Sequence, residues 1–175
     1  MKETKTIRKV FLVYDFEKEE AWLNEMAENG WALCGVGICS YTFEACEPGE
    51  YTVRMEMRGH DDAYQAFLEE IGAEYIGRII QWVYYRRKSS LGAFDLFSDI
   101  DSRISHLQKI GRILTAVGVI NLIFGTMNLL VGLTSAVGNT SVGFLNLLAA
   151  TLLMYCLGRI HGKIEALQKE RLLHE

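Results

Sequence analysis

Hydrophobic residues follow two different periods along the first half of the chain, and then the pattern stops. Up to about residue 88, stretches rich in β-branched and aromatic residues alternate with stretches in which apolar residues recur every three or four positions. The first pattern is typical of strands and the second of amphipathic helices. From Ile113 to Gly158 the chain has no Asp, Glu, Lys, Arg or His. The sequence therefore predicts an α+β domain followed by strongly apolar helices.

Four strands and two helices are expected in the α+β domain. Strands are predicted over residues 6–16, 31–44, 51–58 and 74–88, and helices over residues 17–29 and 62–71. The order β-α-β-β-α-β is that of the ferredoxin-like plan, in which two helices cover one face of a four-stranded antiparallel sheet. Glu17, Glu19 and Glu20 begin the first helix, where carboxylates suit the helix dipole, and are expected to lie in solvent.

The other face of such a sheet has no helix to cover it. In the strand over residues 51–58, apolar residues alternate with polar ones, so Arg54, Glu56 and Arg58 are expected on this open face. We interpret these three residues as candidate contacts for a protein partner. Nucleic acid is not the expected partner, because the net charge is −4 and the pI about 5.6, whereas phosphate binding requires a clustered positive surface.

Two uncharged stretches, residues 113–133 and 142–158, are long enough to cross a bilayer. Lys and Arg lie before the first stretch and after the second, and none lies between them, so both termini are expected in the cytoplasm. The charged N-terminus does not read as a signal peptide. The expected organisation is a cytoplasmic domain (1–97), a connector helix (98–112), a transmembrane hairpin (113–158) and a cytoplasmic C-terminal helix (159–175).

Small and amide residues recur on one face of the first apolar stretch and are matched in the second. They are Gly118, Asn121, Gly125, Asn128 and Gly132, with Asn146 in the second stretch. Glycine lets helices approach closely, and asparagine can donate hydrogen bonds across the contact. The face therefore serves either the packing of the two stretches on each other or the binding of a second copy or another membrane protein.

The residues that could act in catalysis or bind a metal do not form a recognisable motif. The four cysteines and four histidines lack metal-ligand spacing, and Gly35-x-Gly37 lacks the third glycine of a dinucleotide site. We therefore expect no catalytic, metal or cofactor site and a non-enzymatic role. The aromatic residues are either core residues or the walls of a ligand pocket; they include Trp22, Trp31, Tyr51, Trp82, Tyr84 and Tyr85.

Several motifs, in order, give the chain a family resemblance. They are DFEKEEAWLNEM (15–26), Gly30-Trp31, YTFE (41–44), EPGEY (47–51), GAEY (72–75), WVY (82–84) and FSDIDSRI (97–104). Together they resemble an uncharacterised bacterial membrane-protein family, the domain of unknown function 2812. The resemblance implies no established activity and no catalytic residues. Some members are encoded beside PadR-like transcriptional repressors, which implies a role in signalling or in sensing envelope stress.

The combined expectation is a membrane-anchored, non-enzymatic interaction or sensory module of the bacterial inner membrane that tethers or modulates a transcriptional regulator. Its expected partners are the lipid bilayer and a protein, either a PadR-like regulator or another membrane protein, and the chain could also form a homo-oligomer. Two alternatives stay open: a small-ligand sensor, and an accessory subunit of a membrane transport complex.

Overall fold

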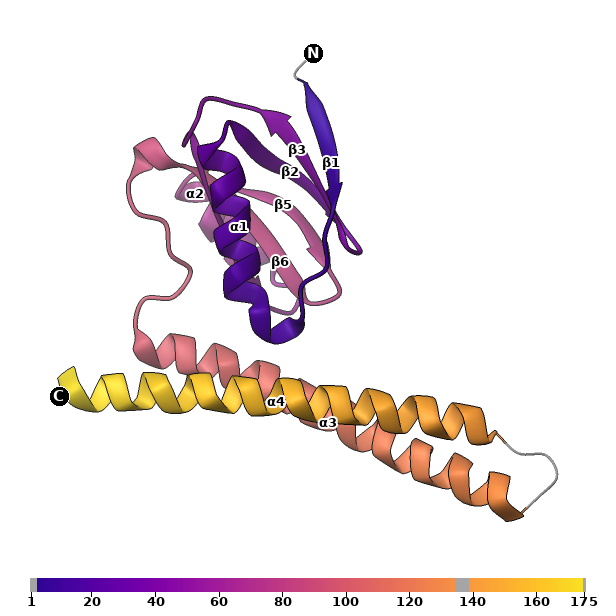
Figure 1. Ribbon diagram of the computed structural model, residues 1–175. Helices are drawn as coiled ribbons and strands as arrows, with labels where there is room; N and C mark the ends of the chain where they lie inside the picture. The colour runs from indigo at the N-terminus through magenta and orange to yellow at the C-terminus, as the bar shows by residue number, and fades with distance from the viewer. Residues whose placement is uncertain (1–2, 135–138, 175) are drawn as a thin grey trace. The chain divides into compact units, whose positions relative to one another are not determined.

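The structure, a computed structural model, describes residues 3–134 and 139–174. It divides into two compact units, residues 1–98 and 99–175. Figure 1 shows an α+β unit followed by a pair of long helices. The expected class, a mixed α+β domain followed by two long apolar helices, is confirmed.

The first unit contains six strands among the described residues. Their bounds, with those of the helices, are β1 (Thr4–Arg8), the 3-10 turn η1 (Val13–Asp15), α1 (Phe16–Glu28), β2 (Trp31–Gly37), β3 (Ser40–Ala45), β4 (Tyr51–Met57), α2 (Asp62–Glu70), β5 (Ala73–Ile79), β6 (Trp82–Lys88) and η2 (Ser89–Leu91). They form two three-stranded antiparallel sheets, a first sheet with the order β1-β3-β2 and a second sheet with the order β4-β6-β5.

This topology differs from the ferredoxin-like plan expected from the sequence. The unit is built from two consecutive β-α-β-β arrangements, β1-α1-β2-β3 and β4-α2-β5-β6, and each makes its own sheet. The two arrangements share sequence landmarks 42 residues apart: Gly30 with Gly72, Gly35 with Gly77, and Ile38 with Ile80. Each sheet also carries a register shift at the corresponding place, just before Gly35 in β2 and just before Gly77 in β5.

The difference arises because two stretches interpreted as long strands are hairpins. Residues 31–44 turn back at Ile38-Cys39, and residues 74–88 turn back at Ile80-Gln81. Tight hairpin turns are usually recognisable in a sequence because Gly, Asn or Asp occupies the positions with a left-handed backbone. Here Cys39 (φ 53°) and Ile80 (φ 56°) adopt those positions instead, so the turns carry no compositional signal.

Strands β2 and β5 lie side by side and run in the same direction. The Arg86 guanidinium, on the strand paired with β5 at Glu74, donates to the Leu33 carbonyl of β2. Three residues further along β2, Val36 lies against Gly77 of β5, where an added Cβ would come within 2.9 Å of its side chain. Because both contact points advance together, the two hairpin tips lie at the same end of the unit, as in Figure 1.

Helix α1 packs against both sheets. Leu23 and Ala27 on its inner face are fully buried, and the helix contacts β2 and β4. It also closes the outer edge of β4, whose backbone groups would otherwise lack a partner strand. The Asn24 amide accepts from Val53 N (2.8 Å) and donates to Val53 O (3.0 Å), and the Glu20 carboxylate accepts from Met55 N (3.0 Å).

The second unit consists of α3 (Ile100–Thr134) and α4 (Thr140–His174). The connector expected at 98–112 and the first apolar stretch thus form one helix, capped by Asp99, whose carboxylate accepts from Ser102 N (2.7 Å). The charged extensions of the two helices lie together, since Arg171 Nη1 is 2.7 Å from Asp101 Oδ1. Part of the expected turn between the apolar stretches lies outside the described residues.

Replacing Asn24 by Ala should destabilise the first unit. The substitution removes the group that satisfies Val53 N–H and C=O at the edge of β4, and leaving such groups unpaired costs about 1–3 kcal/mol. Chemical denaturation of the full chain in detergent would measure the loss, and amide hydrogen exchange at Val53 should accelerate.

Asn29→Ala is the matched control, because the Asn29 amide donates to the Glu25 carbonyl of its own helix at an exposed position. Equal stability losses in the two variants would contradict the edge-closing role of Asn24.

Candidate functional site: a buried carboxylate between two tyrosines

Two carboxylates among the described residues of the first unit are buried, and one of them, Glu19, is held between two tyrosines. Glu19, in the first turns of α1, is only 6% exposed. Its Oε1 accepts hydrogen bonds from Tyr41 Oη (2.8 Å) on β3 and from Tyr84 Oη (2.7 Å) on β6. Since β3 belongs to the first sheet and β6 to the second, the carboxylate joins both sheets through helix α1.

The electrostatic balance at this cluster favours protons. Burial raises the pKa of Glu19 above its usual value of 4.5, and the hydrogen bonds from Tyr84 and Tyr41 offset part of that rise. Burial and the neighbouring carboxylate raise the pKa values of Tyr41 and Tyr84, so both phenols stay protonated and act as donors. The cluster therefore holds two fixed donors around an acid whose charged form is disfavoured.

Aromatic rings gather beside this carboxylate. Trp22, one turn along α1, packs edge-on against Tyr41 (5.2 Å between ring centroids) and Phe43 (5.6 Å). Phe11, from the segment after β1, lies 5.7 Å from Trp22 and 6.3 Å from Tyr41. Such edge-to-face packing fixes the ring positions and presents electron-rich faces.

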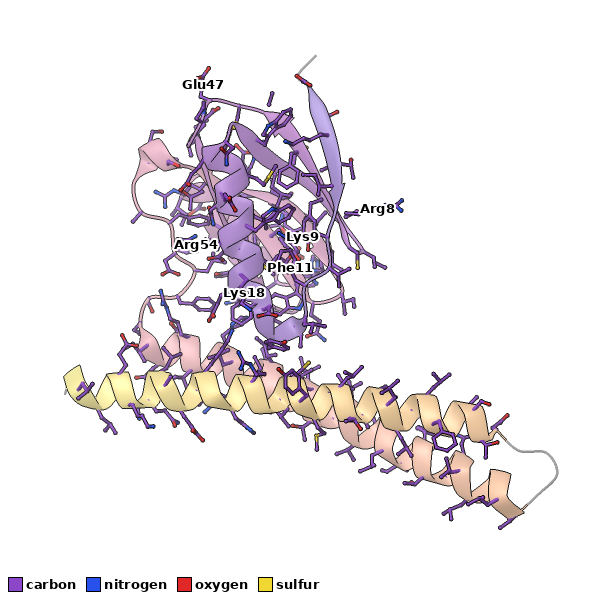
Figure 2. The ribbon with its side chains drawn as sticks, in the orientation of Figure 1. Arg8, Lys9, Phe11, Lys18, Glu47 and Arg54 are labelled. Atoms are coloured by element: carbon purple, nitrogen blue, oxygen red, sulfur yellow. The ribbon has the colours of Figure 1, made fainter. Side chains whose placement is uncertain are left out.

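A lysine ammonium already lies over two of these rings. Lys9 Nζ is 4.3 Å from the centroid of Trp22 and 4.9 Å from that of Phe11. Figure 2 shows Lys9 and Phe11 on the segment that joins β1 to α1. Lys9 also lines a surface hollow of about 440 Å³ together with Arg8, Val10, Ile38, Cys39 and Ser40. The aromatic faces thus accept a cation at the border of a solvent-accessible hollow.

The solvated position expected for the helix-start glutamates is wrong for Glu19. Glu17 is exposed, Glu20 is half-buried and bonded to β4, and Glu19 is buried. The spacing contained the signal, because Glu19, Leu23 and Ala27 recur every four residues and so share one helix face. The stretch has the composition of a solvated helix start, because the inward-facing Glu19 lies between Glu17 and Glu20 in the sequence.

The structure also places the proposed protein contacts differently from the open face expected for them. Glu56 is 3% exposed, Arg58 Nε is 3.0 Å from Glu56 Oε1, and the Arg58 guanidinium lies 3.6 Å above the Tyr64 ring. Arg54 Nη1 is 3.3 Å from Glu20 Oε1 on α1. The face is covered because it also carries Val83 and Tyr85, whose cluster includes Leu68 of α2. The three side chains are engaged within the unit.

The glycine face of α3 lies against α4. An added Cβ at Gly125 would meet Leu147 Cγ at 2.9 Å and the Leu147 backbone N at 3.1 Å, and one at Gly132 would meet Thr140 Cγ2 at 2.7 Å. Gly118 makes ordinary contact with Leu153 and Met154. Of the two readings, packing of the helices on each other matches these contacts.

The asparagines of the same face are half-buried. Asn121 Nδ2 donates to the Val117 carbonyl and Asn128 Nδ2 to the Phe124 carbonyl, both within α3 (2.8 Å each). Asn146 is half-buried in α4. The amides therefore lie beside the helix contact, while the glycines form it.

Comparison with known proteins settles the family. A family described as "Protein of unknown function (DUF2812)" matches residues 15–119. The chain belongs to the DUF2812 family. No curated protein and no solved structure matches the chain.

The residues matched by the DUF2812 family include some of the residues described above and leave out others. It contains Glu19, Tyr41 and Tyr84, and it extends into α3 as far as Val119. Lys9 and Phe11 precede it, and Gly125 and all of α4 follow it. Within residues 3–134 and 139–174, no group of three or more His, Cys, Asp or Glu side chains is placed to hold a metal ion.

Replacing Glu19 by Gln should stabilise the protein at neutral pH. The amide oxygen can still accept from both tyrosines, while the cost of burying a charge disappears. Because the folded pKa of Glu19 is raised, its contribution to the free energy of unfolding is full below pH 4.5 and declines as the pH rises towards the folded pKa. The variant should lack this decline and gain about 1 kcal/mol near pH 7, measurable by denaturation from pH 4 to 8.

Glu17→Gln, at an exposed position on the same helix, should leave the pH profile close to wild type. Some decline should persist in Glu19→Gln because burial also raises the pKa of Glu20. An unchanged slope in Glu19→Gln would show that Glu19 is not the titrating group.

Replacing Gly125 by Leu should separate α3 from α4. The new side chain would collide with the backbone of Leu147, and overpacking of this kind costs about 1–3 kcal/mol. Gly158→Leu is the matched control, since an added Cβ there meets nothing within 4 Å. Thermal unfolding in detergent should report a loss for Gly125→Leu alone, and equal losses would argue against close packing at Gly125.

Proposed function

We propose that the chain is a membrane-anchored, non-enzymatic sensory module. Helices α3 and α4 insert in the bacterial inner membrane as a hairpin with both termini in the cytoplasm, and the α+β unit binds a small organic cation that carries apolar groups. A protein partner, such as a PadR-like regulator, receives the signal. The observation that carries the ligand assignment is the buried Glu19 carboxylate beside aromatic rings that already hold an ammonium group.

The exposed surface of the two long helices supports the anchor. Residues 113–158 contain no charged side chain, yet large apolar side chains in α3 and α4 are more than half exposed, among them Phe124 (56%), Leu130 (64%), Phe144 (63%) and Leu145 (65%). A core helix of a soluble protein would bury such residues. Contiguous apolar surface of this extent is rare on monomeric soluble proteins and is stable in lipid.

The cost of burying Glu19 supports a binding role. A buried carboxylate destabilises a fold unless a charged partner or hydrogen bonds compensate, and its hydrogen-bond donors among the described residues are two neutral phenols. Groups whose pKa values are perturbed by burial cluster at functional sites. An organic cation would supply the missing opposite charge, and the Trp22 and Phe11 faces would attract that charge by cation–π interaction and pack against its apolar groups.

Lys9 gives this site a resting state. Its ammonium lies over the same two rings and borders the 440 Å³ hollow, so a ligand cation would displace it. Displacement moves the exposed Lys9 side chain off the two rings and alters the segment between β1 and α1. The module thus couples ligand binding to a change at its surface, which a partner could recognise.

The proposal predicts that binding requires the Glu19 charge. Thermal unfolding of the full chain in a neutral detergent should shift upward with benzyltrimethylammonium and not with benzyl alcohol, which lacks the cation. The shift should disappear in Glu19→Gln, although that variant is itself more stable, and should grow in Lys9→Met, where the resident ammonium is absent.

Glu17→Gln serves as the charge-matched control and should respond like wild type. An equal shift with both compounds, or a full shift in Glu19→Gln, would reject the cation site. The anchor is tested separately on the same chain, which should remain with membranes after washing with alkaline carbonate.

A further inference from the structure

We propose that one end of the α+β unit docks onto an anionic lipid surface. This docking surface comprises the tips of the two hairpins (Ile38 and Ile80) and the segment after β1 (residues 8–12). The inference rests on the proposed membrane anchor, which keeps the unit close to a bilayer.

The three segments lie at the same end of the unit. Strands β2 and β5 run side by side in one direction, with Val36 against Gly77, so the turns at 38–39 and 80–81 follow at the same level. Arg8 is paired with Ser40 across β1 and β3, and Lys9 N donates to the Cys39 carbonyl (3.2 Å). The segment after β1 therefore adjoins the first tip.

Large aliphatic side chains at this end are exposed to an unusual degree. Ile80 is 86% exposed, Ile38 is 84%, Val10 is 71% and Leu12 is 52%. Single exposed aliphatic residues are common on protein surfaces. Here four occur on adjoining segments, and the two most exposed occupy corresponding positions of the two β-α-β-β arrangements.

Ile80 also carries a conformational cost. Its φ of 56° lies in the left-handed region, where a β-branched residue is a genuine outlier and Gly or Asn would be unstrained. Folding alone gains nothing from an isoleucine at this position. A residue that is both strained and exposed to water indicates that the side chain has a partner outside the fold.

The charges of the docking surface match an anionic partner. Residues 8–12, 36–41 and 78–82 contain Arg8, Lys9 and Arg78 and no acidic residue, whereas the chain as a whole has a net charge of −4. Two carboxylates near these segments are paired with cations: Asp15 with Lys18 (2.7 Å), and Asp61 with Arg58 (3.6 Å), whose backbone N donates to the Gln81 carbonyl. Figure 2 shows Arg8 extending outward from the end of β1.

Aliphatic tips flanked by basic residues are the pattern of peripheral membrane contacts, in which apolar groups enter the headgroup region and cations meet anionic lipid. A protein partner would more commonly be met by aromatic anchors in a packed patch. The charged part of α3, residues 100–112, is about 20 Å long as a helix, which keeps the unit within reach of a bilayer. Tethering raises the local lipid concentration, so a weak contact is sufficient.

Cys39 provides a reporter at the docking surface, because it is the exposed cysteine among Cys34, Cys39, Cys46 and Cys156. The full chain, with the other three cysteines replaced by Ala and a polarity-sensitive fluorophore on Cys39, is reconstituted in nanodiscs. We expect a blue-shifted emission and quenching by lipid-attached quenchers in phosphatidylglycerol, and neither in phosphatidylcholine. High salt should reverse the difference.

The double variant Ile38→Ser with Ile80→Asn should lose the shift without unfolding, since Asn accepts the positive φ at position 80. Phe67→Ser, which removes an exposed side chain (54%) from α2, is the matched control and should retain it. A probe on Glu47→Cys, in a Cys39→Ser background, should report water in both lipids, because Glu47 follows β3 at the end far from the tips.

Cys39 emission that is the same in both lipids, or unchanged in the double variant, would overturn the docking surface. That result is distinguishable from failure of the anchor, which would appear as release of the wild-type chain from membranes by alkaline carbonate, whatever the probe reports.

Discussion

The position of α1 between two separate sheets is the constraint on which the first unit depends. Each sheet has only three strands, so neither has enough partners to bury its apolar face and close its edges alone. On successive turns the helix provides Glu19 for the tyrosines of both sheets, Glu20 and Asn24 for the edge of β4, and Leu23 and Ala27 for the core. The residues of one short helix therefore hold the two sheets together.

The elements that could be predicted from the sequence had a strong local signal. The strand at Tyr51–Met57 and both helices of the first unit were recognisable from spacing, and the long apolar helices from a stretch without charged residues. The hairpin turns were not, because Cys39 and Ile80 occupy backbone positions that composition assigns to Gly or Asn. Without a signal for these turns, β2 and β3 have the pattern of one long strand, and so do β5 and β6. The order of elements then becomes that of the ferredoxin-like plan.

The candidate site escaped sequence analysis for a related reason. The spacing with Leu23 and Ala27 places Glu19 on the inner helix face, but a local pattern does not contain its hydrogen bonds from Tyr41 and Tyr84, which are 22 and 65 residues away. Conversely, Arg54, Glu56 and Arg58 alternate as an exposed strand face should, and the positions of α1 and α2 show that they are engaged within the unit. Both environments depend on long-range contacts that local patterns do not contain.

The boundary between β2 and β5 has a mechanical consequence. The two strands lie side by side, yet they belong to different sheets, and side-chain contacts such as Arg86 with Leu33 and Glu44 hold this boundary together. A joint of this kind can hinge without breaking a ladder of backbone hydrogen bonds. Glu19 accepts a hydrogen bond from a tyrosine on each side of the joint, so a change in the charge of this one carboxylate acts on both sheets at once.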